Sequence, residues 1–160
     1  RQSSNYLKGR TLHPSIPIRD GERVVLRQYV NGGLFRNFNR SLYLFGSRSF
    51  QELFLTEEIQ SCGIPTVQPI AAIYRFILWP LYQAYLLSLE IPHSKDLIQY
   101  FQEIGTRPSR ENIVLKRKTI RSAGLLLRIF HQSGFFQGDI QLKNILVTGD
   151  QLFLIEFDRY

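Results

Sequence analysis

The hydrophobic pattern of the chain changes its period near residue 91, and this change strongly limits the folds that the chain can adopt. Before residue 91, short apolar runs alternate with turns that contain Gly or Pro, which predicts β-strands. Beyond it, apolar residues recur at helical spacing up to residue 132, and a short hairpin pattern follows. This order predicts an α+β, two-lobed architecture.

The first half of the chain is predicted to form β-strands and one helix. A turn around Gly21 joins the first two strands, and Gly63 followed by Pro65 is a helix stop signal. The predicted strands cover residues 15–18, 22–29, 67–74 and 82–90, and the predicted helix covers residues 49–61.

An apolar stretch over residues 70–89 has the composition of a membrane span, but two features argue against that interpretation. Arg75 interrupts it, and the uncharged run over residues 76–89 is shorter than the ~18–20 residues that a span needs. Trp79 and Pro80 are typical of a turn. We therefore expect two buried strands joined by that turn.

The second half is predicted to be mainly helical. Residues 91–94 form a connector, which would be the hinge if the chain has two lobes. The expected helices cover residues 95–103 and 110–132, and the expected final hairpin has strands at residues 144–147 and 152–155.

The chain is basic, with a formal net charge of +7. Basic residues outnumber acidic ones in the first fifty positions and again around residues 116–128, which suits an anionic partner such as a nucleotide phosphate, an acidic membrane surface or a nucleic acid. A solvated cationic face is the alternative. No aromatic RNA-binding signature or zinc-finger spacing supports a nucleic-acid-binding module. Cys62 is the single cysteine, which excludes an internal disulfide, and we expect it in the core at the end of a helix.

Residues 137–147, with the sequence QGDIQLKNILV, carry the clearest chemical signal. Asp139 is followed five positions later by Asn144 and then by an apolar strand, which is the arrangement of a kinase catalytic loop. In such a loop the Asp accepts or orients the proton of the acceptor hydroxyl, and the Asn coordinates Mg²⁺. A long predicted helix before this segment and a predicted hairpin after it are the expected context.

Two carboxylates, Glu156 and Asp158, follow the last predicted strand. Phosphoryl transfer needs a carboxylate that holds Mg²⁺ against the β- and γ-phosphate oxygens, and kinases place it at the end of a strand. Two exposed carboxylates at a strand end are the structural alternative. Together with residues 139–144, they predict a metal site.

Four segments together make the chain resemble the lipopolysaccharide kinase family, which includes kinases of 3-deoxy-D-manno-octulosonic acid (Kdo) and of core heptose. The resemblance runs from about Lys8 to the end of the chain. These segments are VLRQY at residues 25–29 with GGL at 32–34, RSFQE at 48–52, GD at 138–139 with NILV at 144–147, and LIEFDR at 154–159.

The resemblance implies one protein-kinase-like domain with ATP and Mg²⁺ as co-substrates. The implied acceptor is a sugar hydroxyl of the lipopolysaccharide inner core, with Kdo on a lipid A precursor as the leading candidate and no nucleic acid as a partner. It also implies peripheral association with an anionic membrane surface, at the cytoplasmic face of the bacterial inner membrane. Residues 1–90 would form the β-rich lobe, residues 91–94 the hinge and residues 95–160 a partial helical lobe.

The resemblance also assigns residues to the ATP site. Arg27 stands where kinases have the strand lysine that holds the α- and β-phosphates, and Glu52 stands where a helix supplies its partner carboxylate. An exposed strand arginine and a capping box of Ser49 and Glu52 are the alternatives. Gly9 and Arg10 fall where the glycine-rich phosphate loop belongs.

The chain departs from the family pattern in three ways. Gln137 replaces the histidine that often precedes the catalytic Asp by two places, and Glu156 stands where family members have Asp. The family continues with further helices beyond Tyr160, so we expect an incomplete helical lobe. These departures leave two alternatives to a Kdo kinase: a kinase of heptose or another small molecule, and a pseudokinase that binds nucleotide without transfer.

Overall fold

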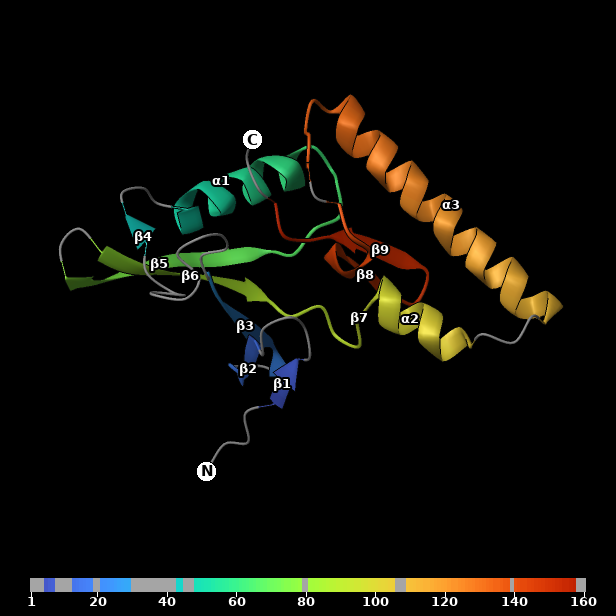
Figure 1. The fold of residues 1–160 in the computed structure, drawn as a ribbon, viewed down its shortest axis with the longest axis horizontal. Helices are drawn as coiled ribbons and strands as arrows, with labels where there is room; N and C mark the ends of the chain where they lie inside the picture. The colour runs from blue at the N-terminus through green and yellow to red at the C-terminus, as the bar shows by residue number, and fades with distance from the viewer. Residues whose placement is uncertain are drawn as a thin grey trace. The chain divides into compact units, whose positions relative to one another are not determined.

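The computed structural model describes residues 5–7, 13–18, 21–29, 43–44, 48–78, 81–105, 109–138 and 140–157 (Figure 1). The chain divides into two compact units. Unit 1 comprises Arg1–Glu57 and Gln68–Glu90, and unit 2 comprises Glu58–Val67 and Ile91–Tyr160. Each unit contains its own antiparallel sheet.

Unit 1 is built on a six-stranded sheet. Strand β6 is its centre, because it pairs with β3, β4 and β5. The predicted hairpin and the two later strands are confirmed, and the turn of that hairpin has Gly21 at a φ of 79°. The strands are β1 (Asn5–Leu7), β2 (His13–Pro17), β3 (Arg23–Gln28), β4 (Tyr43–Leu44), β5 (Pro69–Leu78) and β6 (Leu81–Leu89).

The core of unit 1 lies on one face of this sheet. Tyr29, Tyr82, Ala84 and Leu86 form a buried cluster, against which Leu53 of the helix packs. The prediction that both strands of the 70–89 stretch are buried is correct for β6 and wrong for β5. On β5 the exposed large side chains are Ile70, Ile73, Tyr74 and Phe76.

Helix α1 covers Arg48–Ser61, within one residue of its predicted start. It ends at the predicted stop signal, where Gly63 has a φ of 75° and donates from its backbone N–H to the carbonyl of Gln60. This left-handed conformation suits glycine, because a Cβ would be strained there. The prediction that Cys62 lies in the core is wrong. Cys62 directly follows the last residue of α1, and it is exposed.

Unit 2 contains a three-stranded sheet of β7 (Lys95–Asp96), β8 (Ile145–Thr148) and β9 (Gln151–Leu154), in that order. Lys95 was predicted as the first residue of a helix, but it lies in β7. Helix α2 (Leu97–Ile104) begins two residues later, because the Asp96 carboxylate accepts a hydrogen bond from the Gln99 N–H and caps the helix.

Helix α3 occupies Arg110–Gln132, the range predicted from the sequence. The Ser109 hydroxyl caps it by accepting a hydrogen bond from the Asn112 N–H at 3.1 Å. Its buried residues recur at helical spacing and are Thr119, Ala123, Leu126 and Phe130. Two other apolar residues of this helix, Leu125 and Ile129, are exposed.

No helix in the described part of the chain is both long enough and apolar enough to cross a membrane. The apolar stretch that raised this question forms β5 and β6, which pair with each other along most of their length.

Candidate nucleotide and metal sites

Unit 1 contains a partly buried ion pair between strand β3 and helix α1. Arg27 Nη2 lies 2.7 Å from Glu52 Oε2, and the Glu52 side chain is only 3% exposed. The Arg27 side chain is 20% exposed, so it is partly accessible to solvent. A partly accessible arginine whose guanidinium has a fixed orientation is the type of residue that binds phosphate oxygens.

Glu52 does not form the capping box with Ser49 that was the alternative to this contact. Glu52 follows Ser49 by three positions, but α1 begins at Arg48, so Ser49 is a residue of the helix and does not cap it. The buried Ser49 hydroxyl has no hydrogen-bond partner within the described segments. The capping-box alternative therefore does not hold, and the Glu52 carboxylate is directed to β3 instead.

Tyr29 is a third member of this cluster, and the sequence analysis did not single it out. Its hydroxyl donates a hydrogen bond to the same Glu52 oxygen, and the guanidinium carbon of Arg27 lies 4.8 Å from the centre of its ring. Arg27 and Tyr29 are two residues apart, so strand geometry places them on one face. This two-residue spacing is the feature of the sequence from which the contact between Arg27 and Tyr29 could have been predicted.

Unit 2 brings Asn144 and Glu156 to the same end of the β8–β9 hairpin. Asn144 is the last residue of the short 3₁₀ helix η3 (Leu142–Asn144), and its carbonyl accepts a hydrogen bond from the Ile155 N–H at 2.9 Å. This bond extends the hairpin by one pair beyond Ile145 and Leu154. Glu156 directly follows Ile155, so the hairpin fixes the backbone positions of both predicted metal ligands.

Glu156 has an uncommon backbone conformation, with a φ of 63°. A non-glycine residue in this left-handed region is strained by about 1 kcal/mol or more, and such residues cluster at functional sites. The buried Gln137 side chain donates from Nε2 to the Glu156 carbonyl at 2.6 Å, which holds this conformation. Gln137, noted in the sequence only as a departure from histidine, therefore contacts the candidate metal residue.

Aromatic packing fixes the residue that follows Glu156. Phe157 is 3% exposed, and its ring stacks on Phe130 of α3 with a centroid distance of 5.8 Å. Phe130 also stacks on Phe135, which lies in the segment between α3 and Gln137. Glu156 is thus anchored on both sides, by a hydrogen bond to its own carbonyl and by the burial of its neighbour.

The chemistry of Asn144 and Glu156 fits Mg²⁺. An amide oxygen and a carboxylate are hard ligands of the kind that Mg²⁺ takes, usually one or two from the protein with water and substrate phosphates completing the shell. No group of three or more His, Cys, Asp or Glu side chains that could enclose a metal ion occurs among the described residues.

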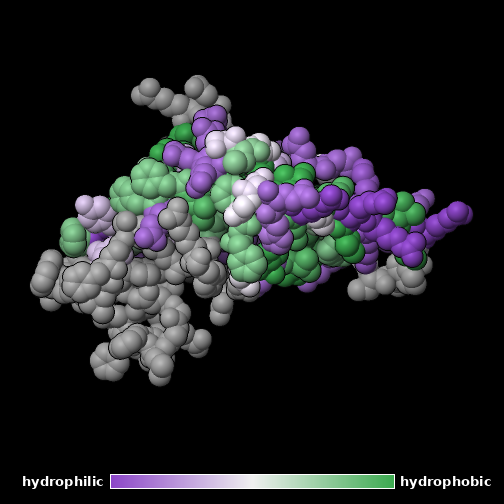
Figure 2. All heavy atoms as spheres, turned by 90° about the horizontal axis from the view of Figure 1, so that it is seen from above, coloured by the Kyte–Doolittle hydropathy of each residue, from purple (hydrophilic) through white to green (hydrophobic). Residues whose placement is uncertain are grey.

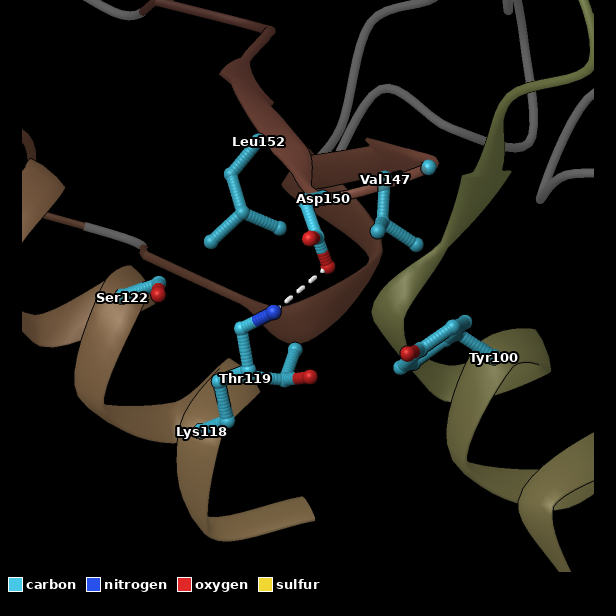
Figure 3. Close-up of a pocket in the computed structure, with 8 residues that line it drawn as sticks. Tyr100, Lys118, Thr119, Ser122, Val147, Asp150 and Leu152 are labelled. Atoms are coloured by element: carbon cyan, nitrogen blue, oxygen red, sulfur yellow. Dashed lines mark hydrogen bonds and ion pairs between the residues drawn. The ribbon is translucent and has the colours of Figure 1, made fainter. Parts of the chain in front are cut away.

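A small pocket lies at the opposite end of the β8–β9 hairpin, against α2 and α3 (Figure 3). Lys118 and Asp150 form an ion pair across it at 2.9 Å, and Tyr100 and Thr119 line it. Its internal space of about 10 Å³ is close to the minimum for one water molecule. It is therefore too small for a nucleotide.

Four predicted site residues lie outside the described residues. They are Gly9 and Arg10 of the expected phosphate loop, the expected catalytic base Asp139, and Asp158, the alternative metal ligand. The structure places Arg27, Glu52, Asn144 and Glu156. It brings Arg27 into contact with Glu52 in unit 1, and in unit 2 it places Asn144 and Glu156 at the same end of the β8–β9 hairpin.

Comparison with curated proteins finds relatives named 3-deoxy-D-manno-octulosonic acid kinase. The relative from Haemophilus influenzae (strain PittEE) is 31% identical over 87% of this chain and 58% of its own length. The relative from Vibrio parahaemolyticus serotype O3:K6 is 33% identical over 88% of this chain and 57% of its own. The chain thus spans less than two thirds of the length of these relatives.

Comparison with solved structures identifies a protein-kinase-like fold. A structure described as WaaP in complex with acyl carrier protein aligns with a TM-score of 0.61 at 14% identity, covering 97% of this chain and 61% of WaaP. The Drosophila melanogaster PAN3 pseudokinase aligns with a TM-score of 0.55 at 16% identity, covering 95% and 39% of the two chains. The α+β, kinase-like fold predicted from the sequence is therefore confirmed.

The sequence profile of the Lipopolysaccharide kinase (Kdo/WaaP) family matches residues 7–160, which is nearly the whole chain. The family predicted from the segments at residues 25–29, 32–34, 48–52, 138–139, 144–147 and 154–159 is thereby confirmed. The chain belongs to the lipopolysaccharide kinase (Kdo/WaaP) family.

Proposed function

We propose that the full-length protein is a sugar kinase that transfers the γ-phosphate of ATP to a hydroxyl of Kdo on a lipid A precursor. Family membership and relatives named as Kdo kinases support the reaction class. The observation that carries most weight in this chain is the pair of Arg27 with the buried Glu52, because an arginine fixed by a desolvated carboxylate is suited to hold phosphates.

In this proposal Arg27 binds the α- and β-phosphate oxygens of ATP. Glu52 orients its guanidinium, and Gly9 and Arg10 belong to the loop that covers the phosphates. A guanidinium that already has its orientation loses little further freedom when the nucleotide binds. The role of this cluster is therefore nucleotide affinity and alignment.

Asn144 and Glu156 would hold Mg²⁺ through their side-chain oxygens, with Asp158 as an alternative to Glu156. When bound, Mg²⁺ neutralises negative charge on the β- and γ-phosphates. The strained backbone of Glu156 and its hydrogen bond from Gln137 support a functional role for this residue.

Asp139 would act as the base. The oxygen of the Kdo hydroxyl forms a bond to the γ-phosphorus while the bond between that phosphorus and the β-bridging oxygen breaks, so ADP leaves. The hydroxyl proton passes to the Asp139 carboxylate. A positioned base contributes about 10²–10⁴-fold to such a step.

We also propose that the protein binds peripherally to an anionic membrane surface, at the cytoplasmic face of the inner membrane, where a lipid-linked acceptor would be met. Four exposed arginines on α3 support this interpretation. They recur at intervals of seven and four residues, which places them on one side of the helix, and none forms an ion pair with another described residue. They are Arg110, Arg117, Arg121 and Arg128. In the view of Figure 2, hydrophilic atoms run along this helix.

A transfer assay tests the proposed reaction. The full-length protein is incubated with Mg²⁺ and radiolabelled ATP, with Kdo-lipid A as one acceptor and a heptose-bearing core as the other. Label on Kdo-lipid A supports the proposal, and label on the heptose-bearing core alone moves the acceptor to heptose.

A nucleotide-binding pseudokinase is the second candidate. It is favoured by Gln137 at the histidine position and by Glu156 at the aspartate position. Mg²⁺-dependent binding of ATP by the full-length protein, with no transfer to either acceptor, would support it over the kinase.

A further inference from the structure

Tyr29 lies in contact with both partners of the Arg27–Glu52 pair. Its hydroxyl and Arg27 Nη2 donate to the same carboxylate oxygen, Glu52 Oε2. Tyr29 and Glu52 are each 4% exposed, so this oxygen is shielded from water and depends on protein donors. A buried carboxylate that loses a donor bears a desolvation penalty, which is larger for a charged group than for a neutral one.

The ring of Tyr29 makes a separate contact with Arg27. The guanidinium carbon lies 4.8 Å from the ring centre, inside the ~6 Å range of a cation–π interaction. The carboxylate therefore restrains the guanidinium at one nitrogen, while the ring contacts it at its central carbon. The two contacts together limit the positions that the guanidinium can take more than either does alone.

The backbone of Tyr29 is held independently of these contacts. Its N–H donates to the carbonyl of Ala84 on β6 at 3.0 Å, and its side chain belongs to the buried cluster with Tyr82 and Leu86. Tyr29 is thus a rigid residue beside Arg27, whose long side chain has considerable rotamer freedom.

We propose that Tyr29 is a positioning residue that orients the Arg27 guanidinium for phosphate binding, through its hydroxyl on Glu52 and its ring on Arg27. This inference rests on the proposed role of Arg27 in binding ATP. It also explains why position 27 suits arginine: a flat guanidinium stacks on an aromatic ring, whereas the compact lysine ammonium lacks that planar shape.

The test is a double-mutant cycle on nucleotide affinity, measured by calorimetry with a non-hydrolysable ATP analogue and Mg²⁺ on the full-length protein. The variants are Tyr29→Phe, which keeps the ring and removes the hydroxyl, Arg27→Ala, and both changes together. Tyr85→Phe is the matched control, because the Tyr85 hydroxyl bonds to Gln83 at 2.9 Å and not to Glu52.

Tyr29→Phe is expected to weaken binding of the analogue about 3–10-fold, which corresponds to the net contribution of one typical hydrogen bond. The Tyr85→Phe control is expected to bind like the wild type. In the Arg27→Ala background, Tyr29→Phe is expected to cause no further loss, because the group that it orients is gone. The loss should appear mainly in the KM for ATP and less in kcat, because removing an interaction made equally in the ground state and the transition state raises KM.

Two results would overturn this inference while leaving the proposed function intact. One is wild-type affinity in Tyr29→Phe, and the other is an equal loss in the wild-type and Arg27→Ala backgrounds, as expected of a residue that only stabilises the fold. If the wild-type protein fails to bind the analogue at all, the proposed function and this inference fall together.

Discussion

The side-chain amide of Gln137 donates a hydrogen bond to the backbone carbonyl of Glu156 at 2.6 Å. It links the segment that precedes Asp139 to the strained residue after β9. Because the Gln137 side chain is buried, the bond is protected from competition by water. Gln137, which stands at the usual histidine position, thus has a structural role that depends on its side-chain amide.

Replacing Gln137 should therefore affect the metal requirement of the enzyme. Gln137→Leu keeps most of the volume and removes the donor, so Glu156 should lose its fixed conformation. We expect the Mg²⁺ concentration for half-maximal turnover to rise several-fold, measured by titrating Mg²⁺ at saturating ATP. Gln137→His, which restores a donor, should recover much of the loss, and Gln151→Leu at an exposed position should resemble the wild type. An unchanged Mg²⁺ requirement in Gln137→Leu would separate this bond from the metal site.

The backbone of Glu156 allows stability and activity to be separated. Glu156→Gly removes the carboxylate and also relieves the left-handed strain at φ 63°. We expect turnover to fall by at least about 100-fold, while the free energy of unfolding stays equal or rises by up to about 1 kcal/mol. His93→Gly, at a second non-glycine residue with positive φ, provides the control and should leave turnover unchanged. Wild-type turnover in Glu156→Gly would shift the metal role to Asp158.

The Arg27–Glu52 pair should contribute to stability as well as to nucleotide binding. Glu52→Gln keeps the shape and removes the charge, which leaves the partly buried guanidinium without its counter-charge. Removing one partner of a buried pair costs about 3–5 kcal/mol, and the 20% exposure of Arg27 places this case near the lower end. Urea unfolding measures the loss, and Glu57→Gln at an exposed position of α1 should stay within about 0.5 kcal/mol of wild type. Equal stability of the two variants would show that the pair makes no net contribution.

The arginines of α3 predict binding to anionic vesicles. Each arginine near an anionic membrane surface contributes about 1 kcal/mol. Changing Arg117, Arg121 and Arg128 to Gln should therefore weaken binding to phosphatidylglycerol vesicles by about 100-fold. A charge-matched control changes Arg75, Lys95 and Lys118 to Gln and should lose much less. Similar losses in both variants would mean that net charge alone governs binding, and no binding to such vesicles by the wild type would contradict a membrane role.

Local signals allowed much of the fold to be predicted. The range of α3 followed from apolar periodicity, and the end of α1 followed from Gly63 and Pro65. Strand β7 was not predicted, because a strand of two residues is too short to show an alternating hydrophobic pattern. Lys95–Asp96 is recognised as a strand only from its pairing with β8. The exposed face of β5 was missed for a related reason, since an apolar run does not reveal which strand is covered.

The candidate site was predictable where a motif carried it. Asn144 and Glu156 followed from the kinase-like spacing, and Arg27 and Glu52 followed from the family resemblance. The hydrogen bonds from Tyr29 to Glu52 and from Gln137 to Glu156 were not predicted, because they join residues 23 and 19 positions apart and no local pattern in the sequence indicates them. The left-handed conformation of Glu156 was also beyond prediction, because surrounding packing imposes it on a residue that does not favour it.

Phosphoryl transfer with Asp139 as the base can be tested by replacing that residue. The experiment compares the rate of γ-phosphate transfer to Kdo-lipid A by the full-length wild-type protein and by Asp139→Ala, at saturating Mg²⁺ and ATP. We expect transfer by the wild type and a rate lower by about 10²–10⁴-fold in the variant, with nucleotide affinity unchanged. Equal rates in the two proteins, or no transfer by the wild type, would contradict it.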